Sequence, residues 1–173
     1  MSWEIDPTHS VVEFSVVHLM ISTVKGRFSD VSGTLHLDPK EPEKSWVKAQ
    51  VSTASIQTIA PQRDAHLRSA DFLDVSRFPN ITFESTRVKL LDQHSSLVEG
   101  NFCIRGISRP VTFQVKYTGR NQDLLTGAWR IGLTARTNID RRDFGMTFNQ
   151  GTAESLLISY QTHIEIHMEA VWL

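Results

Sequence analysis

The C-terminal segment shows the clearest alternation of apolar and polar side chains in the chain. Because successive side chains of a strand point to opposite faces, period two over this length predicts a long strand with one buried face. The apolar parity contains Leu156, Ile158, Tyr160, Ile164, Ile166, Met168, Ala170 and Trp172, and the polar parity contains Ser159, Gln161, His163, Glu165, His167 and Glu169.

The same alternation recurs along most of the chain and predicts further strands with one apolar face. The segment Thr23 to Asp38 is long and contains Gly26 and Gly33, which suggest bulges or tight bends where the sheet curls. The apolar faces elsewhere contain Val12, Phe14 and Val16; Val47, Ala49, Val51 and Thr53; Ile81 and Phe83; Val98, Phe102 and Ile104; Val111, Phe113, Val115 and Tyr117; and Trp129, Ile131, Leu133 and Ala135.

The connections between these segments are mostly short and polar. Asp38 to Ser45, Asp92 to Ser96 and Thr118 to Asp123 are rich in turn-forming residues. About eight strands joined in this way predict an all-β fold, an antiparallel barrel or sandwich. No linker or internal repeat divides the chain, so we expect residues 1–173 to form a single domain.

Closure of the sheet decides what the interior can do. A barrel of roughly eight strands is either filled by side chains or holds one small ligand. The inward candidates are strongly apolar and include aromatic rings, but small residues are mixed among them. The sequence therefore leaves open whether the interior packs tightly or forms an apolar slot.

Composition and charge exclude several classes of function. The formal net charge is −1, so the chain lacks the basic footprint of a nucleic-acid-binding protein. Cys103 stands alone, which excludes an internal disulfide. No apolar run is long enough to span a bilayer, and the N-terminal residues do not resemble a signal peptide. We expect a cytoplasmic protein.

A charged, helix-like insert, Pro61 to Pro79, interrupts the strand pattern. Within it, Arg63 and His66 are three residues apart and share a helical face, and Asp64 precedes Arg68 by four residues, the spacing of a helical ion pair. Two interpretations remain. The insert is a surface helix, or it is a lid over the barrel mouth with Arg63 and His66 turned inward.

Several histidines suggest an alternative function, a metal-dependent or other enzyme that uses His9, His66 or the C-terminal histidines. His163 and His167 flank Glu165 on one face of the last strand, about 13 Å apart at 3.3 Å per residue. That separation is too large for the two rings to chelate one ion, so we expect a solvated outer face. His9 is expected to form hydrogen bonds near the start of the first predicted strand, and no nucleophile elbow accompanies it.

Four stretches of the chain resemble the YceI-like family of lipid-binding proteins, also called polyisoprenoid-binding proteins. The resemblance covers nearly the whole chain and is carried by WEIDPTHSVVEFSVVHLMISTVKGRF (Trp3 to Phe28), QRDAHLRSADFLDVSRFPNITFEST (Gln62 to Thr86), IRGISRPVTF (Ile104 to Phe113) and IDRRDFGM (Ile139 to Met146).

This resemblance implies a lipocalin-like closed barrel that holds a long isoprenoid or similar amphiphilic lipid in an apolar tunnel. It implies no catalytic activity, no metal and no cofactor apart from the bound lipid, and it associates lipid binding with transport or storage. It also implies a homodimer, for which Trp46, Leu157 and Val171 offer outward apolar surface. The charged insert would be a helical cover between the third and fourth strands, with Leu67, Phe72, Leu73 and Phe78 facing the tunnel and the charges facing solvent or the mouth.

The expected site has two parts, an apolar wall for the lipid tail and polar contacts for its head group. The candidates for the head group are His9, Arg63 and His66. The candidates for the apolar wall are Phe14, Val16, His18, Phe28, Leu67, Phe72, Phe78, Phe83, Phe102, Phe113, Phe144 and Met146.

Overall fold

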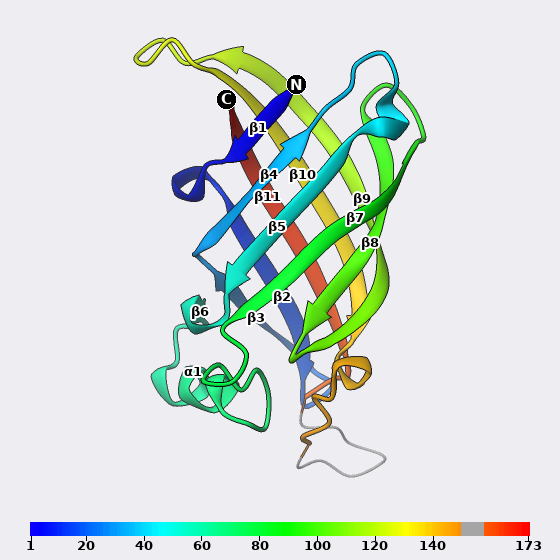
Figure 1. The fold of residues 1–173 in the computed structure, drawn as a ribbon. Helices are drawn as coiled ribbons and strands as arrows, with labels where there is room; N and C mark the ends of the chain where they lie inside the picture. The colour runs from blue at the N-terminus through cyan, green and yellow to red at the C-terminus, as the bar shows by residue number, and fades with distance from the viewer. Residues whose placement is uncertain (150–157) are drawn as a thin grey trace.

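The computed structural model describes residues 1–149 and 158–173, and β-strands dominate this part of the chain (Figure 1). One α-helix is present in it, α1 (Pro61–Arg68), with four short 3₁₀ turns, η1 (Pro7–His9), η2 (Pro42–Lys44), η3 (Thr53–Ser55) and η4 (Arg141–Phe144). The strands are β1 (Ser2–Ile5), β2 (Val11–His18), β3 (Ser22–Phe28), β4 (Val31–His36), β5 (Trp46–Ser52), β6 (Ile56–Gln57), β7 (Asn80–Leu90), β8 (Ser95–Ile104), β9 (Ile107–Gln122), β10 (Trp129–Asp140) and β11 (Gln161–Trp172).

The sheet closes into an antiparallel barrel, which confirms one of the two predicted architectures. Eight strands follow one another in the order β1, β4, β5, β7, β8, β9, β10 and β11, and β11 pairs back to β1. The predicted helix is confirmed in α1, at one end of the barrel, and both chain termini lie at the other end (Figure 1). We call these the α1 end and the terminal end.

Two walls of the barrel are bent, and one bend divides the predicted strand Thr23 to Asp38 into β3 and β4. The C-terminal part of β11, from Ala170, pairs with β1, and its N-terminal part, up to His167, pairs with β2. The turn η1 separates β1 from β2. Likewise β3 and β4 continue one another around a break at Ser29–Asp30. The sequence suggests bulges or tight bends at Gly26 and Gly33, yet the break falls between them. Gly26 serves close packing instead, since a Cβ there would lie 2.3 Å from Cζ of Phe14.

The alternation seen in the sequence matches the two surfaces of the wall. In β11, Ile164 and Ala170 are 6% and 0% exposed, whereas Glu165 between the inward positions lies on the outer surface. The inward positions on β9 and β10 behave in the same way, with Phe113 and Ile131 buried. The parity rule therefore identifies the inward residues correctly because every predicted strand is a wall of one barrel.

Arg130 joins three segments near the terminal end of the barrel. Its guanidinium contacts Asp6 at 2.6 Å, Glu169 at 2.7 Å and Asp123 at 3.1 Å. The hydrogen bond from Arg130, and then the one from Thr8, hold the pKa of the Asp6 carboxyl well below its usual range. This network ties η1, the β9–β10 connection and β11 together where the barrel closes.

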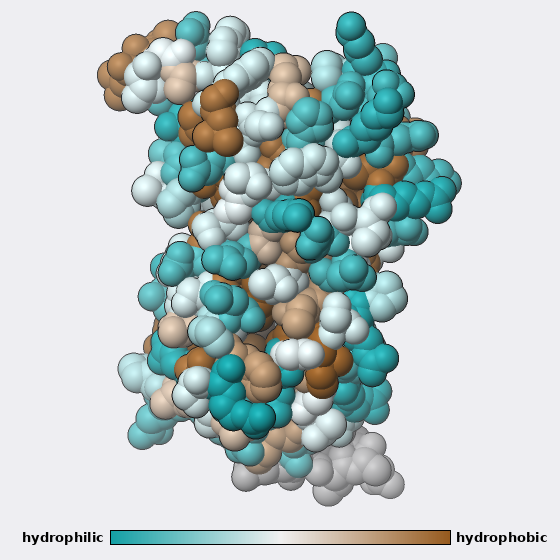
Figure 2. Space-filling view, viewed as in Figure 1, coloured by the Kyte–Doolittle hydropathy of each residue, from teal (hydrophilic) through white to brown (hydrophobic). Residues whose placement is uncertain are grey.

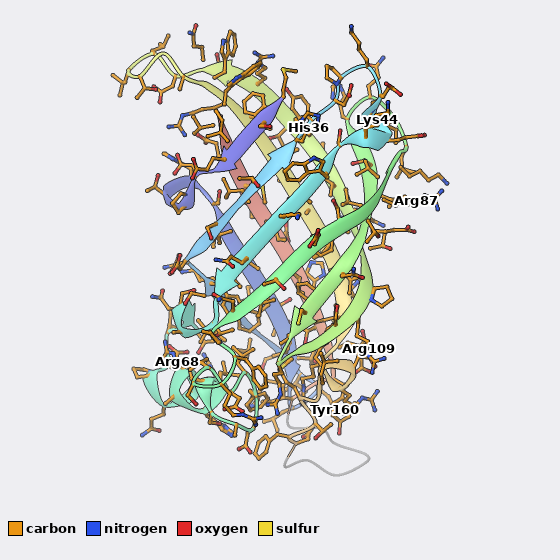
Figure 3. The ribbon with its side chains drawn as sticks, viewed as in Figure 1. His36, Lys44, Arg68, Arg87, Arg109 and Tyr160 are labelled. Atoms are coloured by element: carbon orange, nitrogen blue, oxygen red, sulfur yellow. The ribbon has the colours of Figure 1, made fainter. Side chains whose placement is uncertain are left out.

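Replacing Arg130 by Met is expected to destabilise the barrel by roughly 1–2 kcal/mol at neutral pH, because three carboxylates lose their shared cation. The pKa of Asp6 is lowered in the folded state, so its contribution to stability is present above about pH 4 and is lost as pH falls further. Urea unfolding between pH 3 and pH 7 should therefore show a weaker acid dependence in Arg130→Met than in the parent. Arg87→Met, a change at an exposed position of β7 (Figure 3), is the control, and an unchanged acid dependence in Arg130→Met would contradict the assignment.

The outer surface carries mostly polar residues on the face shown in Figure 2. Apolar side chains are exposed mainly at the barrel ends, most fully at Ile59 before α1 and at Leu124 and Leu125 of the β9–β10 connection, which are 100%, 98% and 96% exposed. No helix in the described part of the chain is long and apolar enough to cross a membrane.

Candidate ligand-binding lumen

The interior of the barrel is hollow. A cavity of about 940 Å³, which we call the lumen, extends from the α1 end to the loops at the terminal end. This volume lies near the upper limit of ordinary small-molecule pockets. The question that the sequence leaves open is therefore decided in favour of an apolar slot.

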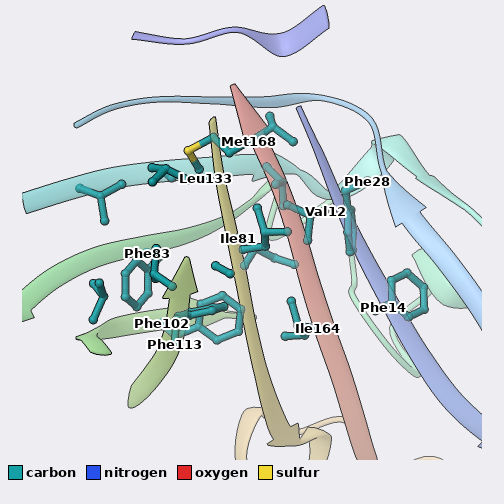
Figure 4. A pocket seen from close by; sticks show the side chains of 18 of the residues that line it. Val12, Phe14, Phe28, Ile81, Phe83, Phe102, Phe113, Leu133, Ile164 and Met168 are labelled. Atoms are coloured by element: carbon teal, nitrogen blue, oxygen red, sulfur yellow. The ribbon is translucent and has the colours of Figure 1, made fainter. Parts of the chain in front are cut away.

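An aromatic cluster forms part of the lumen wall (Figure 4). The rings of Phe83 and Phe113 meet edge to face with centroids 5.0 Å apart, and Phe102 lies 6.0 Å from Phe113 and 6.3 Å from Phe83. These rings come from β7, β8 and β9, which are adjacent in the sheet. Aliphatic side chains complete this region of the wall, among them Val12, Ile81, Leu133, Ile164 and Met168.

Most of the apolar candidates from the sequence come together in this one cavity. The lumen is lined by Phe14, Val16, His18, Phe28, Leu67, Phe72, Phe83, Phe102, Phe113 and Met146.

Two apolar candidates, Phe144 and Phe78, lie outside the lumen lining. Phe144 is 1% exposed and packs behind Phe102, with ring centroids 5.7 Å apart. Phe78 packs near Gly106, where a Cβ would lie 3.0 Å from its ring. The distinction arises because both residues belong to connections outside the strands, where parity gives no information on direction.

The polar candidates separate into two places. Arg63 and His66 line the lumen at the α1 end. His9 does not line it: its Nδ1 lies 3.0 Å from Asp6, and the residue is exposed on the outside of the barrel.

The helical cover is held by contacts that differ from the predicted ion pair. Asp64 is buried and accepts hydrogen bonds from the backbone N–H of Thr58, at 2.8 Å, and from its hydroxyl, at 2.5 Å. Arg68 instead donates to the carbonyl oxygens of Ala54 and Ile56. The expected pairing of Asp64 with Arg68 is therefore wrong, because tertiary partners from the preceding connection satisfy both side chains.

Not all charges of the insert face solvent, which corrects a second expectation. Asp64 and Asp74 are 9% and 6% exposed. Arg63 donates to the hydroxyl and the carbonyl oxygen of Thr58, so its charge lies beside the Asp64 carboxylate that accepts from the same threonine. His66 pairs with Asp71 at 2.8 Å. The apolar side of the cover nevertheless includes Leu67, Phe72 and Leu73 among the lumen-lining residues.

The terminal end of the lumen is also polar. His36, Asp38, Asp92 and His94 contribute to the lining there. Backbone N–H groups donate to both aspartates and lower the pKa of each carboxyl, so both are ionised at neutral pH. The lumen is thus an apolar tube with polar groups at both ends.

Arg141 is a lining residue that the sequence analysis missed. It is 3% exposed and contributes to the lumen wall at the α1 end, although the strand pattern stops just before it. Burial lowers the pKa of its guanidinium. The signal in the sequence is its position in the IDRRDFGM stretch, directly after a predicted strand, from which only Phe144 and Met146 were predicted to line the tunnel.

The histidine clusters do not form a convincing metal centre in the described residues. His163 and His167 lie 3.8 Å and 3.6 Å from Glu165 on the outer face of β11, where these side chains are 41% to 48% exposed. Asp6, His9 and Glu169 do bring ligand atoms within 4.8 Å of one another. However, Arg130 already contacts both carboxylates at 2.6 Å and 2.7 Å, so its positive charge occupies the place that a cation would need.

Comparisons with known proteins agree with this architecture. The model of the YceI-like domain family matches residues 3–170. A UPF0312 protein of Pseudomonas aeruginosa (strain LESB58) is 38% identical over 156 residues, which cover 88% of this chain and 81% of that protein.

Solved structures share the fold at lower sequence identity. The crystal structure of Burkholderia cenocepacia BcnA has a TM-score of 0.84 and 18% identity, and the match covers 95% of this chain and 98% of that one. A polyisoprenoid binding domain from Saccharophagus degradans, implicated in plant cell wall breakdown, has a TM-score of 0.72 and 14% identity, with coverage of 99% and 98%. At these identities the matches show the fold alone.

Proposed function

Because this chain belongs to the YceI-like domain family, we propose that it binds a long-chain isoprenoid or a similar amphiphilic lipid inside its barrel. The observation that carries the proposal is the hollow lumen of about 940 Å³, walled by apolar side chains from strands around the barrel. A tightly packed interior would have kept the fold and removed the function.

The physical basis of binding is the burial of the lipid tail. Each Å² of apolar surface removed from water contributes roughly 25 cal/mol, before the cost of ordering the chain. The wall offers aromatic and aliphatic contacts along its length, including Phe14, Phe28, Phe83 and Phe113. A long tail can therefore bind without specific polar recognition. The polyisoprenoid-binding description of the Saccharophagus degradans domain, which shares this fold, supports the same ligand class.

Transport or storage is the role that fits such a site, and the proposal includes no catalytic step. The lumen wall consists mainly of apolar side chains, and its polar groups lie near the two ends. Among the candidate head-group contacts, Arg63 and His66 stand at the α1 end of the lumen. His9, by contrast, lies outside the lumen and has no place in the proposed lipid site.

Organic extraction of the purified protein tests the proposal. We expect mass spectrometry of the extract to find an amphiphile with a long hydrocarbon chain, in an amount close to one molecule per barrel. Metal analysis of the same sample addresses the alternative function. A stoichiometric metal in a sample without lipid, together with failure to take up added long-chain lipid, would refute lipid binding.

The homodimer remains a prediction. Trp46 is 40% exposed and stacks on His36 near the terminal end, and Val171 is partly exposed on β11. Leu157, the third residue considered for the interface, lies outside the described residues. Light scattering over a wide concentration range should give the mass of two chains, and a monomer at every concentration would rule the dimer out.

A further inference from the structure

Arg141 places a buried positive charge in the wall of the lumen. Its guanidinium donates to three backbone carbonyl oxygens, those of Met146 at 2.6 Å, Ser159 at 3.1 Å and Ile158 at 3.2 Å. It also lies over two aromatic rings, 4.8 Å from the centroid of Tyr160, which Figure 3 labels near the α1 end, and 5.7 Å from that of Phe72.

These contacts satisfy hydrogen bonds but provide no ion pair, and the one carboxylate among the described residues whose charge acts on Arg141, that of Asp140, does so without direct contact. In the described part of the chain, Arg141 forms no ion pair with a carboxylate. The neighbouring carboxylate of Asp140 pairs with Arg142 at 2.7 Å instead. A buried charge is costly unless an opposite charge accompanies it. A guanidinium has five N–H donors, so three bonds to carbonyls leave donors for a further acceptor.

Arg63, the other arginine at this end of the lumen, is in a different electrostatic state. Its donors contact Thr58, and the hydroxyl of Thr58 in turn donates to the carboxylate of Asp64. The charge of Arg63 is therefore balanced within the helical cover. Arg141 belongs to the same end, since Phe72 contacts both Arg141 and His66 of α1.

The charges that line the lumen are distributed unequally between its ends. The lining carboxylates among the described residues, Asp38 and Asp92, both belong to loops at the terminal end, opposite α1 (Figure 1). Arg120 also lines that end, where it lies over the rings of Trp3, Trp129 and Trp172. The carboxylates of the lining thus lie at the terminal end, whereas at the α1 end Arg63 is balanced by Asp64 and Arg141 is the lining arginine whose charge no carboxylate of the described residues contacts.

We propose that Arg141 binds the anionic head group of the lipid, a phosphate or a carboxylate, and thereby fixes the direction of the ligand in the lumen. The head lies at the α1 end beside η4, and the tail extends past Phe102 and Phe113 toward the terminal end. The inference rests on the proposed lipid-binding function and adds the head-group class and the orientation. Arg141 recognises the charge, and the apolar wall accepts the chain.

Three probes with the same C16 chain separate the head-group effect from tail binding. Hexadecyl phosphate, palmitate and 1-hexadecanol would compete with radiolabelled 1-hexadecanol for the purified full-length protein. A charge-assisted hydrogen bond in a buried site is expected to favour the anions by at least about tenfold over the alcohol. Preference for phosphate alone would identify a phosphate site, and preference for both anions would identify a general anionic site.

Variants then assign the preference to one side chain. Arg141→Gln should reduce the ratio between anion and alcohol to below about threefold and leave the affinity for 1-hexadecanol nearly unchanged, because the apolar wall is intact. Arg142→Gln is the matched control: Arg142 follows Arg141 in η4 but is 53% exposed and paired with Asp140, so the anion preference should persist. A full preference in a folded Arg141→Gln protein would overturn the proposal.

A photoreactive probe tests the orientation without any substitution in η4. Palmitate with a diazirine beside its carboxylate should label peptides near Arg141, especially those containing Phe72 or Met146. Labelling near His36 or Asp92 would overturn the proposal even if Arg141→Gln fails to fold. Equal affinity of the parent protein for all three probes would also overturn it while leaving lipid binding established, and failure of every probe to bind would count against the proposed function itself.

Discussion

Replacing Val115 by Trp is expected to eliminate lipid retention while the barrel remains folded. Val115 lies on β9, lines the lumen and is only partly buried, so its side chain borders open space. An indole at this position would project into the cavity that the lipid tail needs. Because tail burial supplies most of the proposed binding free energy, we expect bound lipid to fall by at least about tenfold. Extraction and mass spectrometry of the purified variant measure this directly.

The neighbouring residue provides a matched control for this experiment. Lys116 follows Val115 on the same strand, points to the opposite face and is exposed, so Lys116→Trp adds the same side chain outside the barrel. Lys116→Trp should retain lipid at the parental level, and circular dichroism should show that both variants fold. Full lipid retention by a folded Val115→Trp protein would mean that the ligand does not occupy this part of the lumen.

Replacing Gly33 by Ala is expected to cause a large loss of stability, greater than that of Arg130→Met. Gly33 lies in β4 with φ of 149°, a conformation that residues with a Cβ rarely adopt. A Cβ would also lie 2.2 Å from the carbonyl oxygen of Lys48 and 2.7 Å from Cα of Ala49, both on the paired strand β5. Strain of this kind costs about 1–3 kcal/mol. Since backbone atoms cannot yield as a flexible side chain does, we expect a total loss of at least about 4 kcal/mol.

Gly119 separates conformational strain from the steric clash. Its φ is 146°, close to that of Gly33, but a Cβ there would meet no heavy atom within 4 Å. Gly119→Ala should therefore lose only the roughly 1–3 kcal/mol of backbone strain. Urea unfolding of the two variants gives the comparison. Equal losses would show that the close approach of β4 and β5 does not limit the residue at position 33.

The Gly33 and Gly119 variants test how the barrel wall forms, and the Val115 and Lys116 variants test the space inside it. Gly33 lets β4 approach β5 closely enough for the wall to form, and Val115 borders the space that this wall encloses. If Val115→Trp folds and retains no lipid, the barrel can exist in a folded and empty state. Lipid binding would then be a property of the lumen and not a requirement for folding.

The sequence by itself determined the longer strands, their buried faces and the position of the helix α1. Period two assigned Phe83, Phe102 and Phe113 to the inside, and these three rings meet in the lumen wall. The reason is that the direction of a side chain in a strand is a local property, fixed by the alternation of the backbone. Pro61 and the residues after it likewise encode α1 locally.

The ion-pair partners of the cover and the place of the first strand depended on tertiary contacts. Asp64 lies four residues before Arg68, yet its carboxylate accepts hydrogen bonds from Thr58. The connection from β6 to α1 places Thr58 within hydrogen-bond distance of this carboxylate, and Arg68 binds other partners. The strand β1 has too few residues for a periodic signal, and pairing with β4 and β11 establishes it. Spacing along the sequence contains no information on such partners.

The hollow interior and the charge of Arg141 were decided only by the tertiary structure. Whether inward side chains fill a barrel depends on how rings and small residues from opposite walls meet, which no single strand specifies. Arg141 follows the end of β10, where the alternating pattern stops, and its burial results from carbonyl oxygens of Met146, Ile158 and Ser159 that surround it in space. The alternation along the chain therefore determined which strand residues face inward, whereas only their arrangement around the closed barrel created the lumen and placed Arg141 in its wall.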